Sequence, residues 1–396
     1  MHLERIQLTQ FRSYSTLDLV LPEDGLILTG PNAAGKSSLL EAVRMLSILR
    51  SPRAVHDREV IHWSSGADLD VQPYARLVGY LRIAGERSVV ELGLQRNDDQ
   101  AGTLRKQIKV NGQTRRVLES VGTVRSVLFT PDDLDLVTGS PTGRRRFMDQ
   151  MIGQIDRSYV SELSRYARVV EQRNSLLKSF TKGRTSRSSA IEQLGFWDDQ
   201  LAAHGSYISA ARRMTVGNVG AALKKRADRF VSSADLTAKY APSLGGDFLA
   251  AAQEGDPGEQ ILAVARREFD QQIRMRRDEE LRRGVTLIGP HRDDLELLID
   301  GRSLAAYGSR GQQRLGVVSL KLAEADVVGG KGEKPILLLD DVLSELDRSH
   351  RSLLLKTVRE FGAQIFITSA DPGQVDEPSL TDLAHGEVRP GQIVLA

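Results

Sequence analysis

The stretch Gly30-Pro-Asn-Ala-Ala-Gly-Lys-Ser37 decides the fold class of this 396-residue chain. It matches the pattern G-x-x-x-x-G-K-[ST] at every position. An apolar run over 26–29 precedes it and predicts a strand, and the residues over 36–50 predict a helix. Because this pattern forms a P-loop when it joins a strand to a helix, we predict an α/β fold built around that strand.

The composition of this loop predicts a nucleotide site. Glycines let the backbone approach a phosphate closely, and the backbone amides and the helix N-terminus favour an anion there. We expect Lys36 to neutralise the β- and γ-phosphates and Ser37 to ligate Mg²⁺. The predicted ATP-contacting residues of this segment are Gly30, Pro31, Asn32, Ala33, Ala34, Gly35, Lys36, Ser37 and Ser38.

A second motif, Ile336-Leu-Leu-Leu-Asp-Asp341, predicts a buried strand that ends in two carboxylates. Such a strand leaves its last side chains at the carboxyl edge of a parallel sheet, beside the P-loop. We expect Asp340 to orient Mg²⁺ through water and Asp341 to polarise the attacking water. The predicted catalytic residues are therefore Asp341, Asp340 and Lys36, with Ser37 and Asp340 as the metal residues.

A third motif narrows the class of ATPase. The segment from Tyr307 to Arg314 reads Tyr-Gly-Ser-Arg-Gly-Gln-Gln-Arg and precedes an apolar-periodic helix, with Ser309 as its expected N-cap. This segment resembles the signature motif of ABC-type ATPases, and Leu343-Ser-Glu-Leu-Asp347 resembles their D-loop. The resemblance implies that Ser309, Gly311 and Gln312 contact ATP held by a second copy of the chain.

Longer strings extend the resemblance over the whole chain, to the RecF family of bacterial recombination and replication-repair ATPases. The strings are Phe11-Arg-Ser-Tyr14, Leu128-Phe-Thr-Pro-Asp-Asp-Leu134, Gly143-Arg-Arg-Arg-Phe-Met-Asp149, Glu171-Gln-Arg-Asn-Ser-Leu-Leu-Lys178, Trp197-Asp-Asp-Gln-Leu201, Gly289-Pro-His-Arg-Asp-Asp-Leu295 and the run from Asp340 to Asp347. The resemblance implies an SMC-like head, an ATP-dependent homodimer on DNA, slow ATP hydrolysis, a role in the response to DNA damage, and the partners RecO and RecR. It also suggests that Arg12 reaches the nucleotide phosphates, with a surface position as the open alternative.

Three departures from other ABC-type enzymes favour a slow, switch-like ATPase. The place of the usual Q-loop glutamine, after an expected strand over 124–129, holds Thr130-Pro131-Asp132. Ser369-Ala370 stands where a switch histidine usually follows the strand over 364–368. Asp341 replaces the usual glutamate and is one methylene shorter, which changes its reach toward the water.

The hydrophobic pattern predicts a head made of both ends of the chain. Residues 1–150 and 285–396 are assigned to an ABC-type head, with a mixed P-loop sheet and an antiparallel sheet over 75–111. Residues 151–284 are assigned to a helical insertion domain, with a polar loop over 181–189 and an irregular segment over 241–258. Strands are expected again from Thr286–Ile288 onward.

The charge and composition exclude several classes of protein. The absence of cysteine excludes a disulfide scaffold and a thiolate metal site. No apolar stretch approaches the roughly 18 residues of a membrane helix, so we expect a cytoplasmic protein with no membrane partner. The net charge is only +2, but residues 151–284 carry 22 cationic and 17 anionic side chains, a local +5. That excess is compatible with sequence-tolerant binding of single- and double-stranded DNA.

Two smaller features and three rival functions stay open at this stage. Arg144-Arg145-Arg146 is either a DNA or phosphate contact or a set of intramolecular ion pairs. His291 is better explained as a hydrogen-bonded structural residue than as a catalytic one. An ABC transporter ATPase would carry the missing glutamine and histidine, an SMC tether needs a long coiled coil, and a nucleotide kinase needs neither signature nor D-loop.

Overall fold

The P-loop follows a strand in the middle of a six-stranded sheet of order β15-β14-β3-β13-β12-β8. The strands from β14 to β8 are parallel, and the edge strand β15 is antiparallel to β14. The structure, a computed structural model, describes residues 1–66, 72–97, 103–183, 186–231, 234–250, 257–330 and 332–395. The strands of this sheet are β3 (Gly25–Thr29), β8 (Ser126–Phe129), β12 (Ile336–Asp340), β13 (Ile365–Ser369), β14 (Ala384–Arg389) and β15 (Gln392–Leu395).

A second, antiparallel sheet of order β2-β1-β4-β5-β6-β7 completes the head. The Ala84-Gly85 turn has positive φ at both residues, 50° and 83°, which matches the twist of the two strands it joins. The antiparallel sheet expected over 75–111 is confirmed and also includes the N-terminal strands. Its members are β1 (His2–Phe11), β2 (Tyr14–Val20), β4 (Tyr74–Ile83), β5 (Glu86–Arg96), β6 (Leu104–Val110) and β7 (Gln113–Arg115).

Helix α1 (Lys36–Ile48) starts at the P-loop and lies between the two sheets. Its apolar side chains contact both, so one core contains Leu39 and Leu46 from the helix, Leu28 and Phe366 from the first sheet and Leu77 from the second. All five are fully buried. Burial on every side fixes the direction of α1, and with it the direction in which its N-terminus faces.

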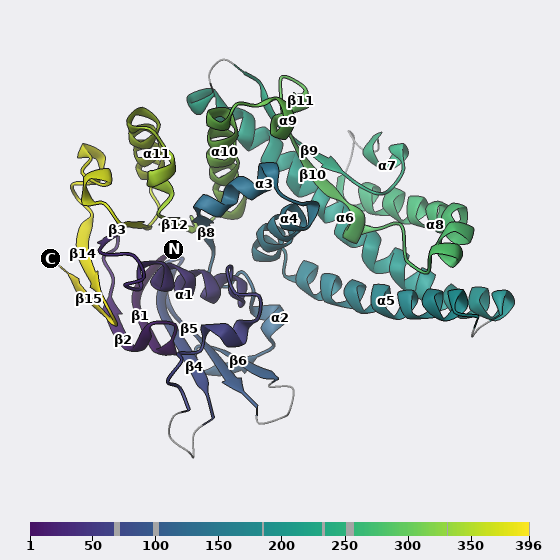
Figure 1. Ribbon diagram of the computed structural model, residues 1–396, viewed down its shortest axis with the longest axis horizontal. Helices are drawn as coiled ribbons and strands as arrows, with labels where there is room; N and C mark the ends of the chain where they lie inside the picture. The colour runs from purple at the N-terminus through teal and green to yellow at the C-terminus, as the bar shows by residue number, and fades with distance from the viewer. Residues whose placement is uncertain are drawn as a thin grey trace.

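A lobe of long helices extends from the head and occupies the right of Figure 1. Helix α6 packs against α5, α8 and α10. A small sheet of order β11-β10-β9 lies against α6. The elements of this lobe are α4 (Pro141–Ile155), α5 (Arg157–Thr181), α6 (Arg187–Phe230), β9 (Leu236–Ala241), α7 (Gly246–Ala250), α8 (Pro257–Arg283), β10 (Asp294–Ile299) and β11 (Arg302–Ser303).

The remaining helices connect the lobe to the first sheet. Helix α10 packs on α6 and on β8, so it bridges the two parts of the molecule. One continuous apolar core extends through the lobe and the head, from Phe269 on α8 to Ile367 on β13. These helices are α2 (Val117–Ser120), α3 (Asp135–Thr138), α9 (Leu304–Tyr307), α10 (Arg310–Gly329) and α11 (Arg348–Phe361).

Two expected elements differ in the structure. The strand expected over Thr286–Ile288 is wrong: Thr286 N–H donates to Asn174 Oδ1 (2.7 Å) and Leu287 N–H donates to Glu280 Oε1 (2.8 Å). These side chains bind the backbone N–H groups that a strand would need for pairing in a sheet. The stretch expected to be irregular over 241–258 contains α7 and the start of α8, and its residues 251–256 lie outside the described residues.

The expected division into a head and an insertion over 151–284 stays a prediction, but one strand pairing and one helix cross its limits. Strand β9 pairs with β10 along its whole length, from Leu236↔Ile299 to Ala241↔Asp294, so one small sheet contains strands from both sides of residue 284. Helix α4 likewise runs across residue 150. The polar loop expected over 181–189 is shorter than expected because α6 begins at Arg187; residues 184–185 lie outside the described residues.

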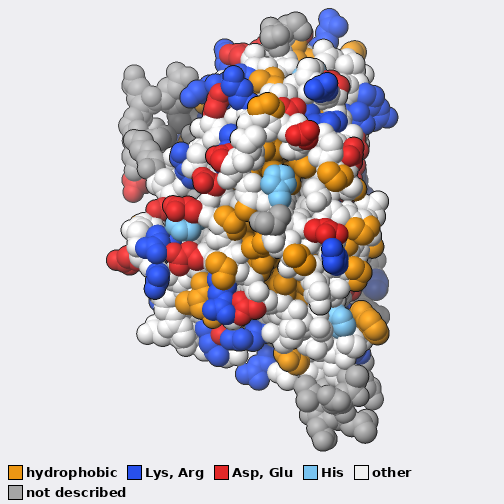
Figure 2. All heavy atoms as spheres, turned by 90° about the vertical axis from the view of Figure 1, so that its left-hand side faces the viewer, with side chains coloured by type: hydrophobic (Ala, Val, Ile, Leu, Met, Phe, Trp, Pro, Cys, Tyr) orange, Lys and Arg blue, Asp and Glu red, His pale blue; other side chains and the backbone are white. Residues whose placement is uncertain are grey.

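The face formed by β14, β15 and α11 has a mixed surface. Figure 2 shows cationic and anionic side chains interspersed there, with apolar side chains between them. Exposed apolar residues of these strands and of the adjacent β2 include Val394, Leu395 and Val20. The described helices include none that combines the length and hydropathy needed to span a bilayer.

Candidate nucleotide site

The P-loop backbone depends on two glycines. Gly30 has φ 147°, and a Cβ there would lie 2.5 Å from the carbonyl oxygen of Val388 on β14. Gly35 has φ 116°, and a Cβ there would lie 2.7 Å from Ser13 Oγ. An L side chain at either position would therefore be strained and would also collide with a neighbouring segment. These contacts explain the spacing of the two glycines in the motif.

Lys36, the first residue of α1, lies across the loop. Its Nζ donates to the carbonyl oxygens of Gly30 (2.6 Å) and Pro31 (2.9 Å). Burial lowers the pKa of Lys36, and the negative charges of Asp341 and Asp340 oppose that effect. The ammonium thus lies in the same field as both carboxylates, as expected for a group that compensates phosphate charge.

The other predicted loop residues divide by exposure. Pro31, Asn32 and Ala33 are exposed at the tip of the loop, whereas Ala34 is buried. Ser38 is half-buried on the first turn of α1, where its N–H donates to Gly35 O (3.0 Å). The predicted segment is thus continuous in space, with an exposed rim around the N-terminus of α1.

Ser37 and Asp340 come together from opposite ends of the chain. Ser37 Oγ donates to Asp340 Oδ1 (2.7 Å), and Thr368 Oγ1 on β13 donates to the same oxygen (2.8 Å). A hydroxyl and a carboxylate are the hard oxygen ligands that Mg²⁺ takes from proteins when phosphates and water supply the rest. The pair therefore fits a magnesium–nucleotide site, and the described residues contain no larger group of His, Asp or Glu that could hold a metal.

Asp341 adopts a left-handed backbone conformation, with φ 53° and ψ 17°. Its N–H donates to Thr368 Oγ1 (3.1 Å), so one threonine hydroxyl contacts both acids of the motif. Aspartate tolerates this conformation better than most residues. The two acids are successive in sequence but differ in burial: Asp340 is buried and Asp341 is half-buried.

Arg53 is a residue of this site that sequence reasoning did not find. Its guanidinium forms a close ion pair with Asp340 Oδ2. Arg53 lies beyond the end of α1 and matches no motif, so only the fold brings it to the carboxylate. Thr368 was also missed, although it directly precedes the Ser369-Ala370 pair at which a switch histidine is absent.

Arg12 is held by α1 rather than by the loop. Its Nε and Nη2 donate to the two carboxylate oxygens of Glu41 (2.9 and 2.8 Å), and Nη1 donates to Glu59 O (3.0 Å). The neighbouring Tyr14 hydroxyl donates to Gly35 O (3.1 Å), which ties this segment to the P-loop. That Arg12 reaches the phosphates stays a prediction.

The signature segment forms a capped helix start. Ser309 Oγ accepts the N–H of Gln312 (3.2 Å), and Gln312 Oε1 accepts the N–H of Ser309 (2.8 Å). Ser309 and Gly311 are exposed, and Figure 1 places α9, which directly precedes them, at the upper edge and α1 in the lower half. Arg314 forms an ion pair with Glu345 (2.8 Å) and so links this helix to the D-loop segment.

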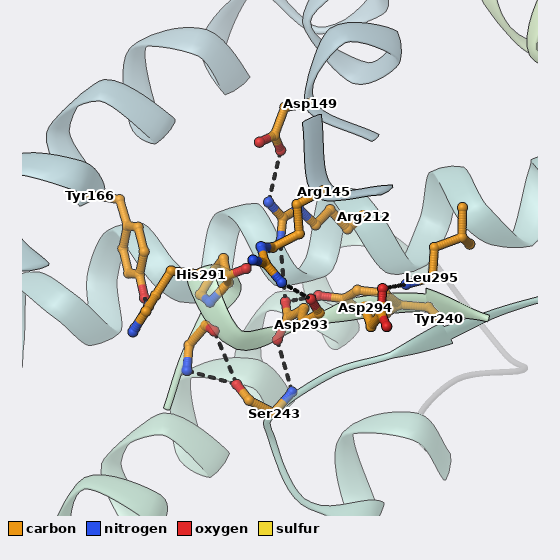
Figure 3. Close-up of polar contacts among 12 residues, drawn as sticks. Arg145, Asp149, Tyr166, Arg212, Tyr240, Ser243, His291, Asp293, Asp294 and Leu295 are labelled. Carbon is orange, nitrogen blue, oxygen red and sulfur yellow. Dashed lines mark hydrogen bonds and ion pairs between the residues drawn. The ribbon is translucent and has the colours of Figure 1, made fainter. Parts of the chain in front are cut away.

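A second polar cluster, which we call the Arg212 junction, explains the string Gly289–Leu295. Arg212 donates to Asp149 (2.8 Å), Asp293 (3.3 Å) and the carbonyl oxygen of Pro290 (2.6 Å), and Tyr240 contacts Asp293 as well. Figure 3 shows these side chains converging from α4, α6, β9 and the turn before β10. Both Arg212 and Asp293 are buried, so the junction is a structural one.

The three successive arginines from Arg144 to Arg146 differ in whether they form contacts within the chain. Arg144 forms two hydrogen bonds with the carboxylate of Asp294 (2.7 and 2.8 Å), and Arg145 donates to Asp293 O (2.9 Å). Arg146 is exposed and has no hydrogen-bond or ion-pair partner among the described residues. Two of the three therefore hold β10 against α4, and only Arg146 is free for an external anion.

His291 is a hydrogen-bonded residue of the same turn. Its Nδ1 pairs with the Tyr166 hydroxyl (2.7 Å), and its Nε2 faces Thr286 O (3.3 Å). Burial lowers the pKa of His291 to about 4. The imidazole is therefore neutral near pH 7, in agreement with the structural interpretation.

A third polar cluster, the Arg173 network, gives a structural reason for polar residues in the strings Glu171–Lys178 and Trp197–Leu201. Arg173 is fully buried and donates to Asp198 (2.9 Å), Glu280 (2.5 Å) and Thr286 Oγ1 (2.9 Å). These residues belong to α5, α6, α8 and the turn that follows it. The network thus joins the three long helices by one guanidinium.

The comparisons with known proteins identify close relatives over the whole chain. Residues 2–382 match the family described as RecF/RecN/SMC N terminal domain. The chain is 42% identical over 395 residues to the DNA replication and repair protein RecF of Thermomicrobium roseum, with 98% of each chain covered. It is 38% identical over 400 residues to the protein of that name from Herpetosiphon aurantiacus, with 99% of each covered.

Solved structures agree with the fold. The recombination mediator protein RecF in the RecFOR pathway, in the form RecF-ATPrS, matches with a TM-score of 0.84 and 28% identity over 100% of this chain and 98% of that chain. An Smc head bound to the C-winged helix domain of ScpA matches with a TM-score of 0.53 and 13% identity over 100% and 97%. The second likeness concerns the fold alone, and the expected ATPase-head fold is confirmed.

Proposed function

The chain belongs to the RecF family, within the RecF/RecN/SMC group, and from that premise we propose that it is an ATP-dependent DNA-binding ATPase of DNA replication and recombinational repair. The observation that carries the proposal is the hydrogen bond between Ser37 and Asp340 beside the Lys36 ammonium. It brings the three groups that a Mg²⁺–ATP site requires to one sheet edge, from positions about 300 residues apart. The relatives' solved forms, RecF-ATPrS and RecF-ATP, support nucleotide binding.

In this proposal the chain's own groups bind ATP as follows. The Gly30–Gly35 backbone and the N-terminus of α1 surround the phosphates, and Lys36 leaves its carbonyl partners to neutralise them. Ser37 and Asp340 hold Mg²⁺, which when bound neutralises phosphate charge during hydrolysis. Asp341 orients the attacking water from the mouth of the site. Its short side chain and the absence of the usual glutamine and histidine favour slow turnover.

We infer dimerisation from the exposure of the signature. Ser309 and Gly311 are exposed and Gln312 is half-buried at the start of α10, so this segment presents a helix N-terminus to the outside. We infer that these residues contact ATP held by a second copy. The γ-phosphate would then hold two copies together, and its loss would release them.

DNA and protein partners complete the proposal. The dimer holds single- or double-stranded DNA by phosphate contacts, because the described elements include no base-reading module. A relative's structure is described as part of the RecFOR pathway, which supports partnership with RecO and RecR. A cytoplasmic location accords with these proposed partners.

Two variants test the composite site together. Ser309→Arg places a long cation where the phosphate must approach, so chains should bind ATP but not dimerise. Lys36→Ala should lose ATP binding. A mixture should recover part of the ATP-dependent dimer, because a mixed dimer joins one intact P-loop to one intact signature. Light scattering with and without ATP measures the dimer.

The same mixture distinguishes this proposal from an ordinary P-loop ATPase. Ser309→Arg chains that dimerise with ATP as wild type does would remove the signature role. Lys36→Ala chains that bind an ATP analogue with wild-type affinity would remove the nucleotide site itself. As a matched control, Arg348→Ala, at an exposed helix start without an assigned role, should leave dimerisation unchanged.

A further inference from the structure

We propose that Arg53 competes with Mg²⁺ for Asp340 and moves to Asp132 when the metal binds. Binding of Mg²⁺ with the nucleotide would thereby change the contacts of the segment that follows β8. This inference rests on the proposed nucleotide site. Arg53 would be a positioning residue, since it acts through Asp340 and contacts neither nucleotide nor metal.

The first observation is how the oxygens of Asp340 are divided. Oδ1 accepts from Ser37 Oγ (2.7 Å) and Thr368 Oγ1 (2.8 Å), whereas Oδ2 faces Arg53 in a close ion pair. The Asp340 side chain is only 2% exposed, so water cannot replace a lost partner easily. The carboxylate is therefore compensated by a guanidinium from within the chain.

The charges in the site indicate that Arg53 and Mg²⁺ cannot bind Asp340 at the same time. A dication beside Ser37 and Asp340 would lie close to the Arg53 guanidinium, in a site already occupied by the Lys36 ammonium. Two positive groups that share one buried carboxylate repel strongly, because the site is poorly screened. Arg53 must therefore leave Asp340 when Mg²⁺ binds there.

The structure fixes the backbone of Arg53 while leaving its side chain free to move. Ser51 Oγ accepts the N–H groups of Arg53 (3.1 Å) and Ala54 (2.7 Å) and donates to Glu41 Oε1 (2.5 Å). Glu41 is the buried carboxylate that also binds Arg12. The Arg53 side chain is 39% exposed, so its far end can swing while its Cα stays in place.

A cavity of about 440 Å³ provides the second position. Arg53 lines it together with Asp132, which is exposed and has no hydrogen-bond or ion-pair partner among the described residues. The other charged side chains that line it are Arg44, Arg146, Lys321, Asp133 and Asp135. Three of these are already engaged: Arg44 donates to Ser126 O, Asp133 accepts Thr130 N–H (2.7 Å), and Lys321 contacts Glu324.

Movement of Arg53 to Asp132 would affect the segment that follows β8. Asp132 belongs to Thr130-Pro131-Asp132, which stands where ABC-type enzymes usually carry the Q-loop glutamine. An arginine that transfers from Asp340 to Asp132 would link metal binding to this segment by charge, without a glutamine. The segment leads through α3 into α4, which starts the helical lobe.

The test measures binding of a fluorescent non-hydrolysable ATP analogue over a series of free Mg²⁺ concentrations. Arg53→Ala should lower the Mg²⁺ midpoint by about 3–10-fold, because the metal no longer displaces a cation from this partly buried ion pair. Asp132→Asn should raise the midpoint by about 2–3-fold, because Arg53 loses its second partner. Arg53→Lys, which keeps the charge, should stay near wild type.

Arg50→Ala is the matched control, since Arg50 is an exposed arginine in the same loop region with no ion pair among the described residues. It should leave the midpoint unchanged. An unchanged midpoint in Arg53→Ala would overturn the inference. So would a loss of analogue affinity at saturating Mg²⁺, which would make Arg53 a direct phosphate contact.

The variant Lys36→Ala distinguishes a wrong role for Arg53 from a wrong assignment of the nucleotide site. If Lys36→Ala abolishes analogue binding while Arg53→Ala leaves the midpoint unchanged, only the role of Arg53 is wrong. If Lys36→Ala binds the analogue as wild type does, the nucleotide site and this inference fall together.

Discussion

At the scale of single residues, the hydroxyl of Thr368 contacts both acids of the candidate site. It donates to Asp340 and accepts the N–H of Asp341, so the two successive acids are held in different environments. The left-handed turn at Asp341 is compatible with this arrangement. Asp340 is therefore buried beside Ser37, whereas Asp341 stays half-buried, and the two different roles proposed for these acids rest on that difference.

Asp341→Asn should separate ATP binding from hydrolysis. The amide preserves size but removes the negative charge that orients water, so we expect turnover to fall by about 10²-fold or more, in the range of general acid–base effects. Asp340 and Ser37 stay intact, so ATP should still bind and the ATP-bound dimer should last longer. Phosphate release and light scattering measure the two effects. Wild-type turnover would remove Asp341 from the mechanism.

His291 predicts a pH dependence of stability. Its pKa is lowered to about 4 in the folded protein, against about 6.5 in an unfolded chain. Below about pH 6.5 the unfolded state binds the proton first, so stability should fall as the pH drops toward 4, by at most about 3 kcal/mol. Above that range His291 should contribute no pH dependence.

Urea unfolding at pH 7.0 and 5.0 measures this effect. His291→Gln should be less stable at pH 7 but should lose less stability between the two values. His385→Gln, at an exposed position on β14, is the control and should keep the wild-type difference. An identical difference in all three proteins would contradict the assignment to His291.

At the scale of elements, the Arg173 network holds α5, α6 and α8 together. Arg173→Leu would leave the fully buried Glu280 without its cation, and removal of one partner of a buried pair typically costs about 3–5 kcal/mol. Arg187→Leu breaks the exposed pair with Asp278 and should cost less than about 1 kcal/mol. Fluorescence of Trp197, next to Asp198, reports unfolding of the lobe. Equal losses in both variants would refute the difference in burial as the cause.

The elements show where sequence reasoning succeeds and where it fails. The P-loop strand, α1 and the strand ending in Asp340 were predicted because their signals are local: a motif, an apolar run and a helical period. The sequence predicts no strand at β9 and wrongly predicts one over Thr286–Ile288, because partners distant in sequence decide both. Thr286 turns away from a sheet since Asn174 and Arg173 take its polar groups.

The site follows the same rule. Lys36, Ser37 and Asp340 each stand in a motif whose spacing predicts a role, and the structure brings the three residues together. Arg53 carries no such spacing, because its partner Asp340 lies 287 residues away. A contact that only tertiary structure creates leaves no periodic or motif signal near either residue.

At the scale of the whole molecule, the nearly balanced charge predicts that the proposed DNA contacts are confined to local regions. Residues 151–284 carry the +5 excess, whereas the face of β14 and β15 is mixed in sign. We expect binding that tolerates any sequence and weakens steeply with salt, because phosphate contacts release counterions. Titrations of two unrelated duplexes of equal length at several salt concentrations measure this. A flat salt response, or a strong preference for one duplex, would contradict it.

The parallel sheet has a consequence for synthesis on the ribosome. Strand β3 enters the sheet between β13 and β14, so its two neighbours are among the last segments to be translated. From Thr29 to Ile365 the chain grows for roughly 20–70 s at about 5–20 residues per second. During that interval both edges of β3 lack their final partners, and the nascent P-loop cannot adopt its finished form. We therefore expect nucleotide binding only after the C-terminal strands leave the exit tunnel, so a product truncated before these strands should not compete for ATP.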